Sequence, residues 1–372
     1  MRWGRSLLPL RAAGRAVAAN PGGGTGPTWV SGSRVIRLIL ILLWVALPGA
    51  VFSAVLAPDP GTGTRPAAFA NPLMPGADPH ALLVDKTMWV YPTESGGPGG
   101  RFFAYSSTDV RHWHRQGPVL DFRDVRWIPD DGQPRHGAWA PAVVECRGNF
   151  YFYYSAGPQN PTPSRIGVAV ADGPAGPFVD SGRPLLTGGA GFEAIDPMVF
   201  RDPHSDIAYF YAGGSAGAKL RVFELNRDMI SFAREVPVST PPAFTEGVFM
   251  HYRQGIYYLS YSHGGFRDSS YSVHYATAPS PTGPWTYRGP ILTSDVTRKG
   301  PGHHAFAQSP LDGEWLIFYH RWENQQGDGP YHGSRQVCVD RVVFDPAGLI
   351  QPIQMTSDPS PRGRVPRSAS GE

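Results

Sequence analysis

The stretch Ala194-Ile195-Asp196-Pro197-Met198-Val199-Phe200 decides the fold of this chain. Its aspartate stands directly before an apolar run, a polar turn follows at 202–206, and an aromatic run closes the unit at 207–211. Apolar runs separated by Asp, Asn or Gly turns are typical of β-hairpins. The stretch therefore predicts two antiparallel strands, with a carboxylate at the start of the first.

The same pattern occurs at four more places, each time followed by a turn and an aromatic strand. The copies read ADPHALLV from Ala77, WAPAVVEC from Trp139, FTEGVFMHY from Phe244 and GHHAFAQS from Gly302. Their anchor positions are 78, 140, 196, 246 and about 304, so the unit recurs roughly every 50–60 residues, a period near that of β-propellers. We therefore predict an all-β fold, a five-bladed β-propeller, preceded by an N-terminal signal or membrane-anchor segment.

A second echo predicts the outer strands of the blades. The segments beginning at Ser106, Ala169 and Ala276 each contain a strand end, a polar turn, an aromatic residue and a step through Pro into two aliphatic residues. High counts of Gly (45) and Pro (39) agree with a turn-rich β domain. Sustained helical periodicity is scarce, so few helices are expected.

Charge is distributed unevenly along the chain. The formal net charge is +3, but residues 1–70 carry seven Arg and only one Asp, so the remainder is slightly acidic. No basic cluster stands out in the sequence of the propeller region, which argues against nucleic-acid binding.

The front of the chain predicts export. Residues 1–37 form a basic leader, 38–57 an uncharged apolar run of 20 residues, and 58–70 a linker. The apolar run predicts either a cleaved signal peptide or a membrane tether, and in both cases a secreted or cell-surface protein. The propeller is assigned to 71–356 and a polar tail to 357–372, and we expect a monomer. Cys146 and Cys338 either pair outside the cell or stay buried as free thiols.

Propeller geometry brings the starts of the inner strands together at one end of the axis. Those positions carry Asp78, Ala140 behind Trp139, Asp196, Glu246 and the pair His303-His304. Each residue alone is equally at home at a strand start, but three carboxylates that crowd one mouth perturb one another's pKa values and indicate a functional site. Two carboxyl groups, one protonated and one ionised, are the requirement of glycoside hydrolysis. Trp127 and Trp139 are candidates for stacking on a sugar, with packing in the core as the alternative.

These residues carry a family resemblance. From Asn71 to Ile353 the chain resembles glycoside hydrolase family 43, inverting propeller enzymes that act on arabinose- and xylose-containing glycans. The matching motifs are ADPH, WAP, IDPMVF, FTEGVFM, GPGHHAF and SRQVCVDRVVFDPAGLI. The resemblance implies that Asp78 is the general base and Glu246 the general acid, while Asp196 tunes the pKa of the acid and orients it.

The resemblance also implies the groups that surround the carboxylates. Trp139, His303, His304 and Arg335 are assigned to substrate binding, and His303 to a cation or ordered water on the propeller axis. No cofactor is required for the chemistry, and a structural Ca²⁺ on the axis is expected as an addition. The partner is an oligo- or polysaccharide.

Several functions stay open at this level. We expect an exo-acting α-L-arabinofuranosidase, with β-xylosidase, endo-arabinanase and β-1,3-galactosidase as alternatives within the fold. A fructan hydrolase is disfavoured, because such enzymes open with an Asn-Asp-Pro-Asn strip where this chain has Ala77-Asp78-Pro79-His80. A non-catalytic glycan-binding propeller would repeat its binding residues in every blade. Two long segments, 120–136 and 322–333, are expected to form the rim and to favour exo action.

Overall fold

A computed structural model describes residues 69–94, 99–215 and 217–357 of this protein. The predicted leader, apolar run and most of the linker, together with the tail from residue 358 onward, lie outside the described residues. Within the described ranges no helix combines the length and apolar character that crossing a membrane requires.

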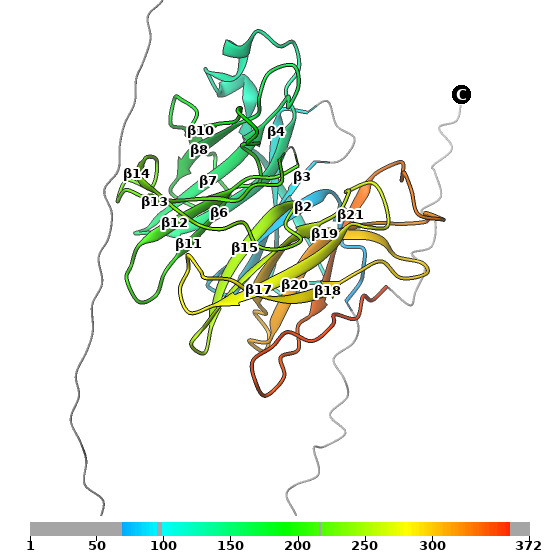
Figure 1. Cartoon of the computed structure of the whole chain (residues 1–372). Helices are drawn as coiled ribbons and strands as arrows, with labels where there is room; N and C mark the ends of the chain where they lie inside the picture. The colour runs from blue at the N-terminus through cyan, green and yellow to red at the C-terminus, as the bar shows by residue number, and fades with distance from the viewer. Residues whose placement is uncertain (1–68, 95–98, 216, 358–372) are drawn as a thin grey trace, which may run out of the picture. The chain divides into compact units, whose positions relative to one another are not determined.

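Five antiparallel sheets follow one another along the chain (Figure 1). Blade 1 contains β2 (Ala77–Val84), β3 (Thr87–Thr93), β4 (Arg101–Ser107) and β5 (His114–Asp121). Blade 2 contains β6 (Ala138–Cys146), β7 (Asn149–Ala156), β8 (Arg165–Ala171) and the short β9 (Val179–Asp180) and β10 (Leu186–Thr187). Blade 3 contains β11 (Met198–Arg201), β12 (Ala208–Ala212), β13 (Arg221–Leu225) and β14 (Phe232–Val236). Blade 4 contains β15 (Glu246–Arg253), β16 (Ile256–His263), β17 (Ser272–Ala278) and β18 (Thr286–Leu292).

The fifth blade closes the ring. It contains β19 (Lys299–Gln308), β20 (Trp315–Trp322) and β21 (Arg335–Arg341), and its outer strand is β1 (Met74–Pro75) from the beginning of the domain. The inner strand β2 contacts both β6 and β19, and β15 contacts β11 and β19, so the five inner strands surround one axis. Inner strands β2, β15 and β19 lie together at the centre of Figure 1. The predicted five-bladed propeller is therefore confirmed, and its closure by β1 is a feature that the repeats did not predict.

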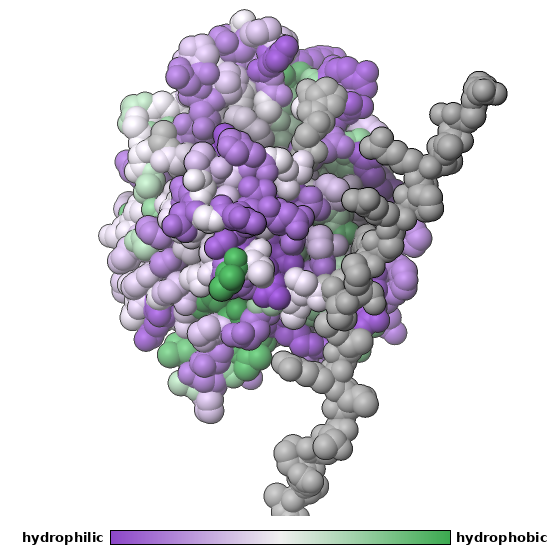
Figure 2. All heavy atoms as spheres, turned by 90° about the vertical axis from the view of Figure 1, so that its right-hand side faces the viewer, coloured by the Kyte–Doolittle hydropathy of each residue, from purple (hydrophilic) through white to green (hydrophobic). Residues whose placement is uncertain are grey.

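The second strand of each blade explains the aromatic runs. These strands are buried along most of their length, as the pattern of β7 and β12 shows. A central strand of a blade is covered on both faces by neighbouring blades, so its residues need not alternate between apolar and polar. Cys146 and Cys338 lie in this core as buried free thiols. The face of the molecule in Figure 2 is mostly hydrophilic, with small hydrophobic patches.

The predicted rim segment between blades 1 and 2 holds the two short helices of the described chain. Both are 3-10 helices, η1 (Phe122–Asp124) and η2 (Ile128–Asp131). Trp127, a candidate for sugar stacking, is buried beneath them: its ring stacks on Tyr154 and its indole N–H donates to Asp180 at 3.0 Å. Trp127 therefore belongs to the core.

Candidate active site

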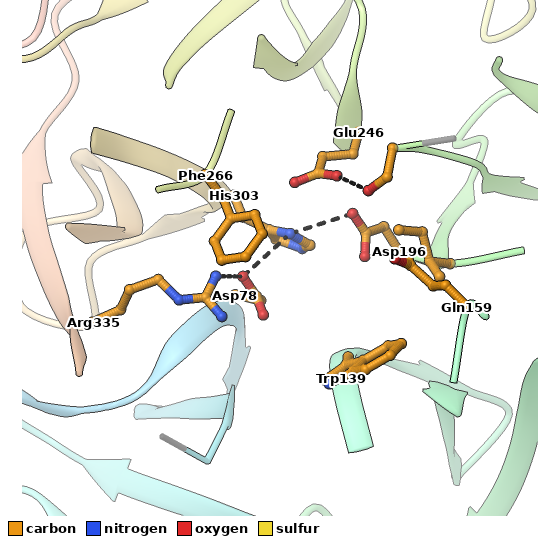
Figure 3. A pocket seen from close by; sticks show the side chains of 10 residues that line it. Asp78, Trp139, Gln159, Asp196, Glu246, Phe266, His303 and Arg335 are labelled. Atoms are coloured by element: carbon orange, nitrogen blue, oxygen red, sulfur yellow. Dashed lines mark hydrogen bonds and ion pairs between the residues drawn. The ribbon is translucent and has the colours of Figure 1, made fainter. Parts of the chain in front are cut away.

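A pocket of about 200 Å³ opens on the axis, where the inner strands begin. Figure 3 shows its acidic and aromatic side chains facing one another across the opening. The lining residues are Asp78, Trp139, Gln159, Ile195, Asp196, Ser215, Glu246, Phe266, His303 and Arg335. Of the seven predicted site residues, only His304 is absent from this lining.

A repeated backbone distortion positions the inner-strand residues. Each inner strand or its approach contains a residue with left-handed φ at the equivalent position, and the four strands β2, β6, β15 and β19 shift register there, as at a β-bulge. The five residues are Asp78, Ala140, Asp196, Gly247 and His303, with φ of 48°, 40°, 56°, 62° and 39°.

One of the predicted anchors is thereby corrected. The equivalent residue of blade 4 is Gly247, not Glu246, whereas that of blade 5 is His303, one of the two histidines predicted there. The sequence comparison aligned Glu246 with the two aspartates because all three are carboxylates, and it therefore missed an offset of one residue. The repeat is defined by backbone conformation and not by residue type. Glu246 therefore reaches the pocket from the strand position that Trp139 occupies in blade 2.

The N–H groups of the left-handed residues are satisfied by a second repeated feature. In four blades the N–H donates to a side chain near the end of the second strand of the preceding blade. The pairs are Asp78 with His320 Nδ1 at 3.0 Å, Ala140 with Thr93 Oγ1 at 2.7 Å, Asp196 with Ser155 Oγ at 3.0 Å and His303 with Ser262 Oγ at 2.9 Å. Since buried N–H groups are costly to leave unpaired, these contacts fix the strand starts.

The left-handed residue of blade 4 lacks such a partner, because blade 3 has no acceptor side chain at the end of its second strand. The residue at that position is Gly213, whose N–H donates to the carbonyl of Ile195 at 3.0 Å. Asp196 supplies the missing acceptor: its Oδ2 accepts the hydrogen bond from the N–H of Gly247 at 3.0 Å. The carboxylate of Asp196 is thus tied to the backbone next to Glu246.

Asp78 is surrounded by positive and polar groups. Arg335 Nη1 lies 2.9 Å from Asp78 Oδ1, His320 Nδ1 lies 3.2 Å away and His303 Nδ1 3.5 Å away. Burial by itself would raise the pKa of Asp78, but Arg335 and the two imidazoles outweigh it and hold the pKa well below its ordinary value. Asp78 is therefore ionised at neutral pH.

Asp196 has the opposite environment. Burial, followed by the nearby carboxylates of Glu246 and Asp78, raises the pKa of Asp196 well above its ordinary value. Asp196 therefore keeps its proton under conditions in which Asp78 has lost its own. Two carboxyl groups with opposite protonation preferences in one pocket are the arrangement that acid–base chemistry requires.

Glu246 is held by two hydroxyl groups. Tyr271 donates to its Oε1 at 2.8 Å and Ser215 to its Oε2 at 2.5 Å. The Tyr271 ring is buried, stacks on the His320 imidazole with centroids 5.6 Å apart, and lies so close to Gly302 that a Cβ there would meet the ring at 2.1 Å. The orientation of Glu246 therefore depends on residues from three other segments of the chain.

The two adjacent histidines separate. His303 faces the pocket, with Nδ1 3.5 Å from both Asp78 and Asp196, and burial lowers its pKa. His304 is 2% exposed and its Nε2 lies 2.6 Å from Ser260 Oγ, in the core of the axis. Successive side chains of a strand point to opposite faces, so His304 does not reach a substrate in this pocket. We leave it out of the substrate site.

The cation expected on the propeller axis can be compared with the ligands that the axis offers. Ca²⁺ prefers six to eight oxygen ligands, whereas the axis here presents imidazoles and two carboxylates already paired with His303. Among the described residues no group of three or more His, Cys, Asp or Glu is arranged to hold a metal ion. The side chains of the described residues therefore do not form a calcium cage.

Aromatic side chains wall the pocket. The Trp139 ring packs against Gly137 and Gly157, at both of which a Cβ would lie within 2.3 Å of the ring. Phe266 is 43% exposed and the guanidinium of Arg335 lies 5.1 Å from its ring centroid. Figure 3 shows Phe266 and Trp139 on different sides of the opening. Such exposed rings suit stacking on a sugar face.

A second hollow of about 570 Å³ continues outward from the pocket. The two share Trp139, Gln159, Phe266 and Arg335. Both predicted rim segments contribute to the outer hollow, through Arg135 and His136 from one and Trp322, His332 and Gly333 from the other. The interpretation of these segments as rim is thus supported.

Several site residues were missed from the sequence. His320 and Ser155 lie near the ends of the aromatic strands, where an alignment of the second strands would show a polar residue in four of five repeats. Gln159, Ser215, Phe266 and Tyr271 lie in or beside loops outside the repeat, and no pattern in the sequence marks them.

The chain matches known proteins over most of the propeller. The model of "Glycosyl hydrolases family 43" matches residues 69–350. A β-D-galactofuranosidase of Aspergillus niger is 33% identical over 305 residues, covering 77% of this chain and 85% of that protein. A xylosidase/arabinosidase of Bacteroides ovatus is 31% identical over 337 residues, covering 76% of this chain and 97% of that protein. The crystal structure of a thermostable family-43 glycoside hydrolase superposes with a TM-score of 0.66 at 26% identity, covering 79% of this chain and 98% of that one.

Proposed function

Because the chain belongs to glycosyl hydrolase family 43, it is a glycosidase that hydrolyses O-glycosidic bonds, and we propose that it is an exo-acting α-L-arabinofuranosidase. Its substrates are arabinose- or xylose-containing glycans, in line with the name of the Bacteroides relative. The observation that carries the proposal is the opposed environment of Asp78 and of the Asp196–Glu246 pair in one pocket.

The reaction is a single displacement. Asp78, ionised beside Arg335, accepts a proton from a water molecule, whose oxygen forms a bond to the anomeric carbon. The bond from that carbon to the leaving oxygen breaks, and Glu246 gives its proton to this oxygen. The sugar is released with inverted configuration. At the end of the reaction Asp78 is protonated and Glu246 is ionised. Asp78 then loses its proton to solvent and Glu246 takes one up, which restores the starting state.

The surrounding groups keep the two carboxyl groups in different states. Burial and the carboxylates of Glu246 and Asp78 raise the pKa of Asp196, so Asp196 resists losing its proton beside Glu246. Arg335 and His303 contact Asp78 and bias it toward the ionised form. Tyr271 and Ser215 orient the carboxyl group of Glu246 toward the leaving oxygen.

Exo action is supported by the small size of the pocket and by its aromatic walls. About 200 Å³ suits one sugar ring, and Trp139 and Phe266 narrow the entrance. An endo-acting enzyme needs an open cleft that a chain can cross. The larger outer hollow is available to the aglycone.

A β-D-galactofuranoside is the second candidate for the bound sugar. One of the curated relatives is a β-D-galactofuranosidase. The ring of β-D-galactofuranose has the same configuration as that of α-L-arabinofuranose and differs by one additional hydroxymethyl group on the exocyclic carbon. The space that the pocket leaves beside that carbon would decide between the two sugars.

The decisive experiment compares aryl glycosides. We expect hydrolysis of aryl α-L-arabinofuranoside to exceed that of β-D-galactofuranoside, β-D-xyloside and β-D-galactoside. Glu246→Gln is expected to remove most activity on natural glycans but less on substrates with a good leaving group, since these need little protonation. Equal loss on both substrate types would contradict the role of Glu246 as the acid, and no hydrolysis of any furanoside would refute the sugar assignment.

Stereochemistry tests the mechanism separately. An inverting pair has carboxyl groups roughly 6.5–9.5 Å apart, which leaves room for water. Proton NMR of the first-formed sugar, read before mutarotation, is expected to show inversion. Retention of configuration would require a covalent intermediate and would overturn the role of Asp78 as a base.

We infer that the enzyme acts outside the cytoplasm or at the cell surface. This rests on the basic leader and the apolar run at 38–57 alone. Fractionation of cells that express the full chain, set against a variant lacking residues 1–57, tests the proposal. Equal export of both forms would contradict it.

A further inference from the structure

Arginines gather along the outer hollow and its continuation. The outer hollow shares Gly99, Arg135 and His136 with a further groove of about 510 Å³ beside η1 and η2. Together the two grooves are lined by five arginines and a single acidic residue. The arginines are Arg123, Arg126, Arg135, Arg267 and Arg335, and the acid is Glu94.

Most of these arginines are not neutralised. Arg335 pairs with Asp78 and Arg123 with Asp121, whereas Glu94 pairs with Arg115, which does not line the grooves. Among the described residues no carboxylate lies within 4.0 Å of Arg126, Arg135 or Arg267, although the rest of the domain forms many Arg–carboxylate pairs. The domain from residue 71 onward has more acidic than basic residues, so a high average positive charge does not explain the cluster.

Arg267 is held in place without a counter-charge. Its Nε donates to the carbonyl of Tyr331 at 3.2 Å and its Nη2 lies 3.0 Å from His332 Nδ1. The backbone N–H of Tyr331 in turn donates to the carbonyl of Arg267 at 2.6 Å, which ties the blade 4 loop to the blade 5 loop. A fixed guanidinium loses less conformational entropy when it binds an anion.

We propose that this arginine-lined groove binds an anionic substituent of the glycan on the leaving-group side of the scissile bond. The inference rests on the proposed glycosidase activity and adds to it the charge of the substrate. The ligand chemistry is a carboxylate or phosphate group carried by the glycan, since both are recognised by guanidinium forks. Phe266 and Arg335 belong to both hollows, so the groove lies on the path along which an aglycone leaves the pocket.

The test measures competition against whichever aryl glycoside the enzyme hydrolyses. The competitors are neutral xylo-oligosaccharides, oligogalacturonates of matched length and glycerol-phosphate oligomers, at constant ionic strength. We expect at least one of the anionic oligomers to inhibit about tenfold more tightly than the neutral one, given the strength of charge-assisted hydrogen bonds. Comparison of the two anions identifies the source, and the preference is expected to shrink in high salt.

Variants connect the preference to the groove. In the double variant Arg135→Gln/Arg267→Gln, anionic and neutral oligomers are expected to inhibit equally well. The control Arg288→Gln, on β18 and outside both grooves, also removes an arginine charge and is expected to leave the ratio unchanged. The kcat and KM for the aryl glycoside, measured in the same assays, report whether each variant is folded.

Three outcomes would overturn the inference: anionic oligomers that inhibit no better than neutral ones, a preference that survives the double variant, or an equal loss in Arg288→Gln. If no aryl glycoside is hydrolysed, the proposed function fails. Calorimetric binding of the same oligomers to the full chain then still decides whether the groove binds anions.

Discussion

At the scale of single residues, the three carboxylates differ in what surrounds them and not in their chemistry. Asp78 lies against a guanidinium and two imidazoles, whereas Asp196 lies against two other carboxyl groups. The first environment favours loss of a proton and the second favours its retention. The same residue type therefore serves two roles in one pocket.

Replacement of Asp196 by Asn is expected to change the shape of the pH–rate profile. Burial and the neighbouring carboxylates raise the pKa of Asp196, and the like charge of Asp196 beside Glu246 is expected to set the position of the alkaline limb. Asn removes the like charge, so the alkaline limb of kcat/KM is expected to move to lower pH, while the acidic limb from Asp78 stays well below neutral. A profile that keeps its shape and only loses height would indicate a positioning role.

Replacement of Tyr271 by Phe tests the hold on Glu246. The ring and its stacking on His320 are retained, and only the hydrogen bond to Glu246 Oε1 is lost. A misdirected acid is expected to lower kcat by about 10-fold, less than the roughly 10²–10⁴-fold contribution of a complete acid–base group, with KM nearly unchanged. Loss is expected to be smaller on aryl glycosides with good leaving groups. A loss independent of the leaving group would indicate a general structural effect.

At the scale of elements, the strand starts repeat a backbone device and not a residue. Each left-handed residue has a side-chain acceptor in the preceding blade. Four of these acceptors lie near the end of the second strand, whereas Gly213 has no side chain and the acceptor for Gly247 is Asp196. This exception links blade 3 to blade 4 at the position where the acid is placed. Because this hydrogen bond differs from those in the other blades, the five strand starts are not equivalent, and the site that they form is asymmetric.

Ser155→Ala and Thr93→Ala form a matched pair for this device. Both leave one buried N–H without its acceptor, at Asp196 and at Ala140 respectively, so both are expected to lower the free energy of unfolding by about 1–3 kcal/mol. Ser155 supports a catalytic carboxylate, whereas Thr93 supports Ala140, which does not line the pocket, and therefore only Ser155→Ala is expected to reduce kcat/KM strongly. Urea denaturation and steady-state kinetics measure the two effects. Equal kinetic losses in both variants would contradict the argument.

At the scale of the whole molecule, the ring is closed by a short segment at its beginning. Asn71 is 1% exposed; its Nδ2 donates to the carbonyl of Val339 at 2.7 Å and its Oδ1 accepts the N–H of Val339 at 2.9 Å. The side chain thus extends the pairing between β1 and β21 from Val337 to Val339. The closure holds Arg335, at the start of β21, beside Asp78.

Asn71→Ala is expected to destabilise the propeller by about 2–4 kcal/mol, because two buried backbone groups lose their partners. Asn226→Ala, at an exposed turn of blade 3, removes comparable side-chain hydrogen bonds and is expected to cost much less. Thermal and urea unfolding compare the two. Similar losses would show that the closure carries no special weight.

The sequence by itself determined the number of blades, the order of strands within them and six of the residues that line the pocket. It could do so because hairpin patterns are local and a repeat multiplies the signal of each copy. Only the tertiary structure decided that Gly247, and not Glu246, is the residue of blade 4 that corresponds to Asp78 and Asp196. It also decided that His303 faces the pocket while His304 faces the core. Finally, it brought Tyr271, Phe266 and Arg267 to the site. Those outcomes depend on bulges and on loops from different blades that meet in space, and contacts between distant segments leave no periodic trace in the chain.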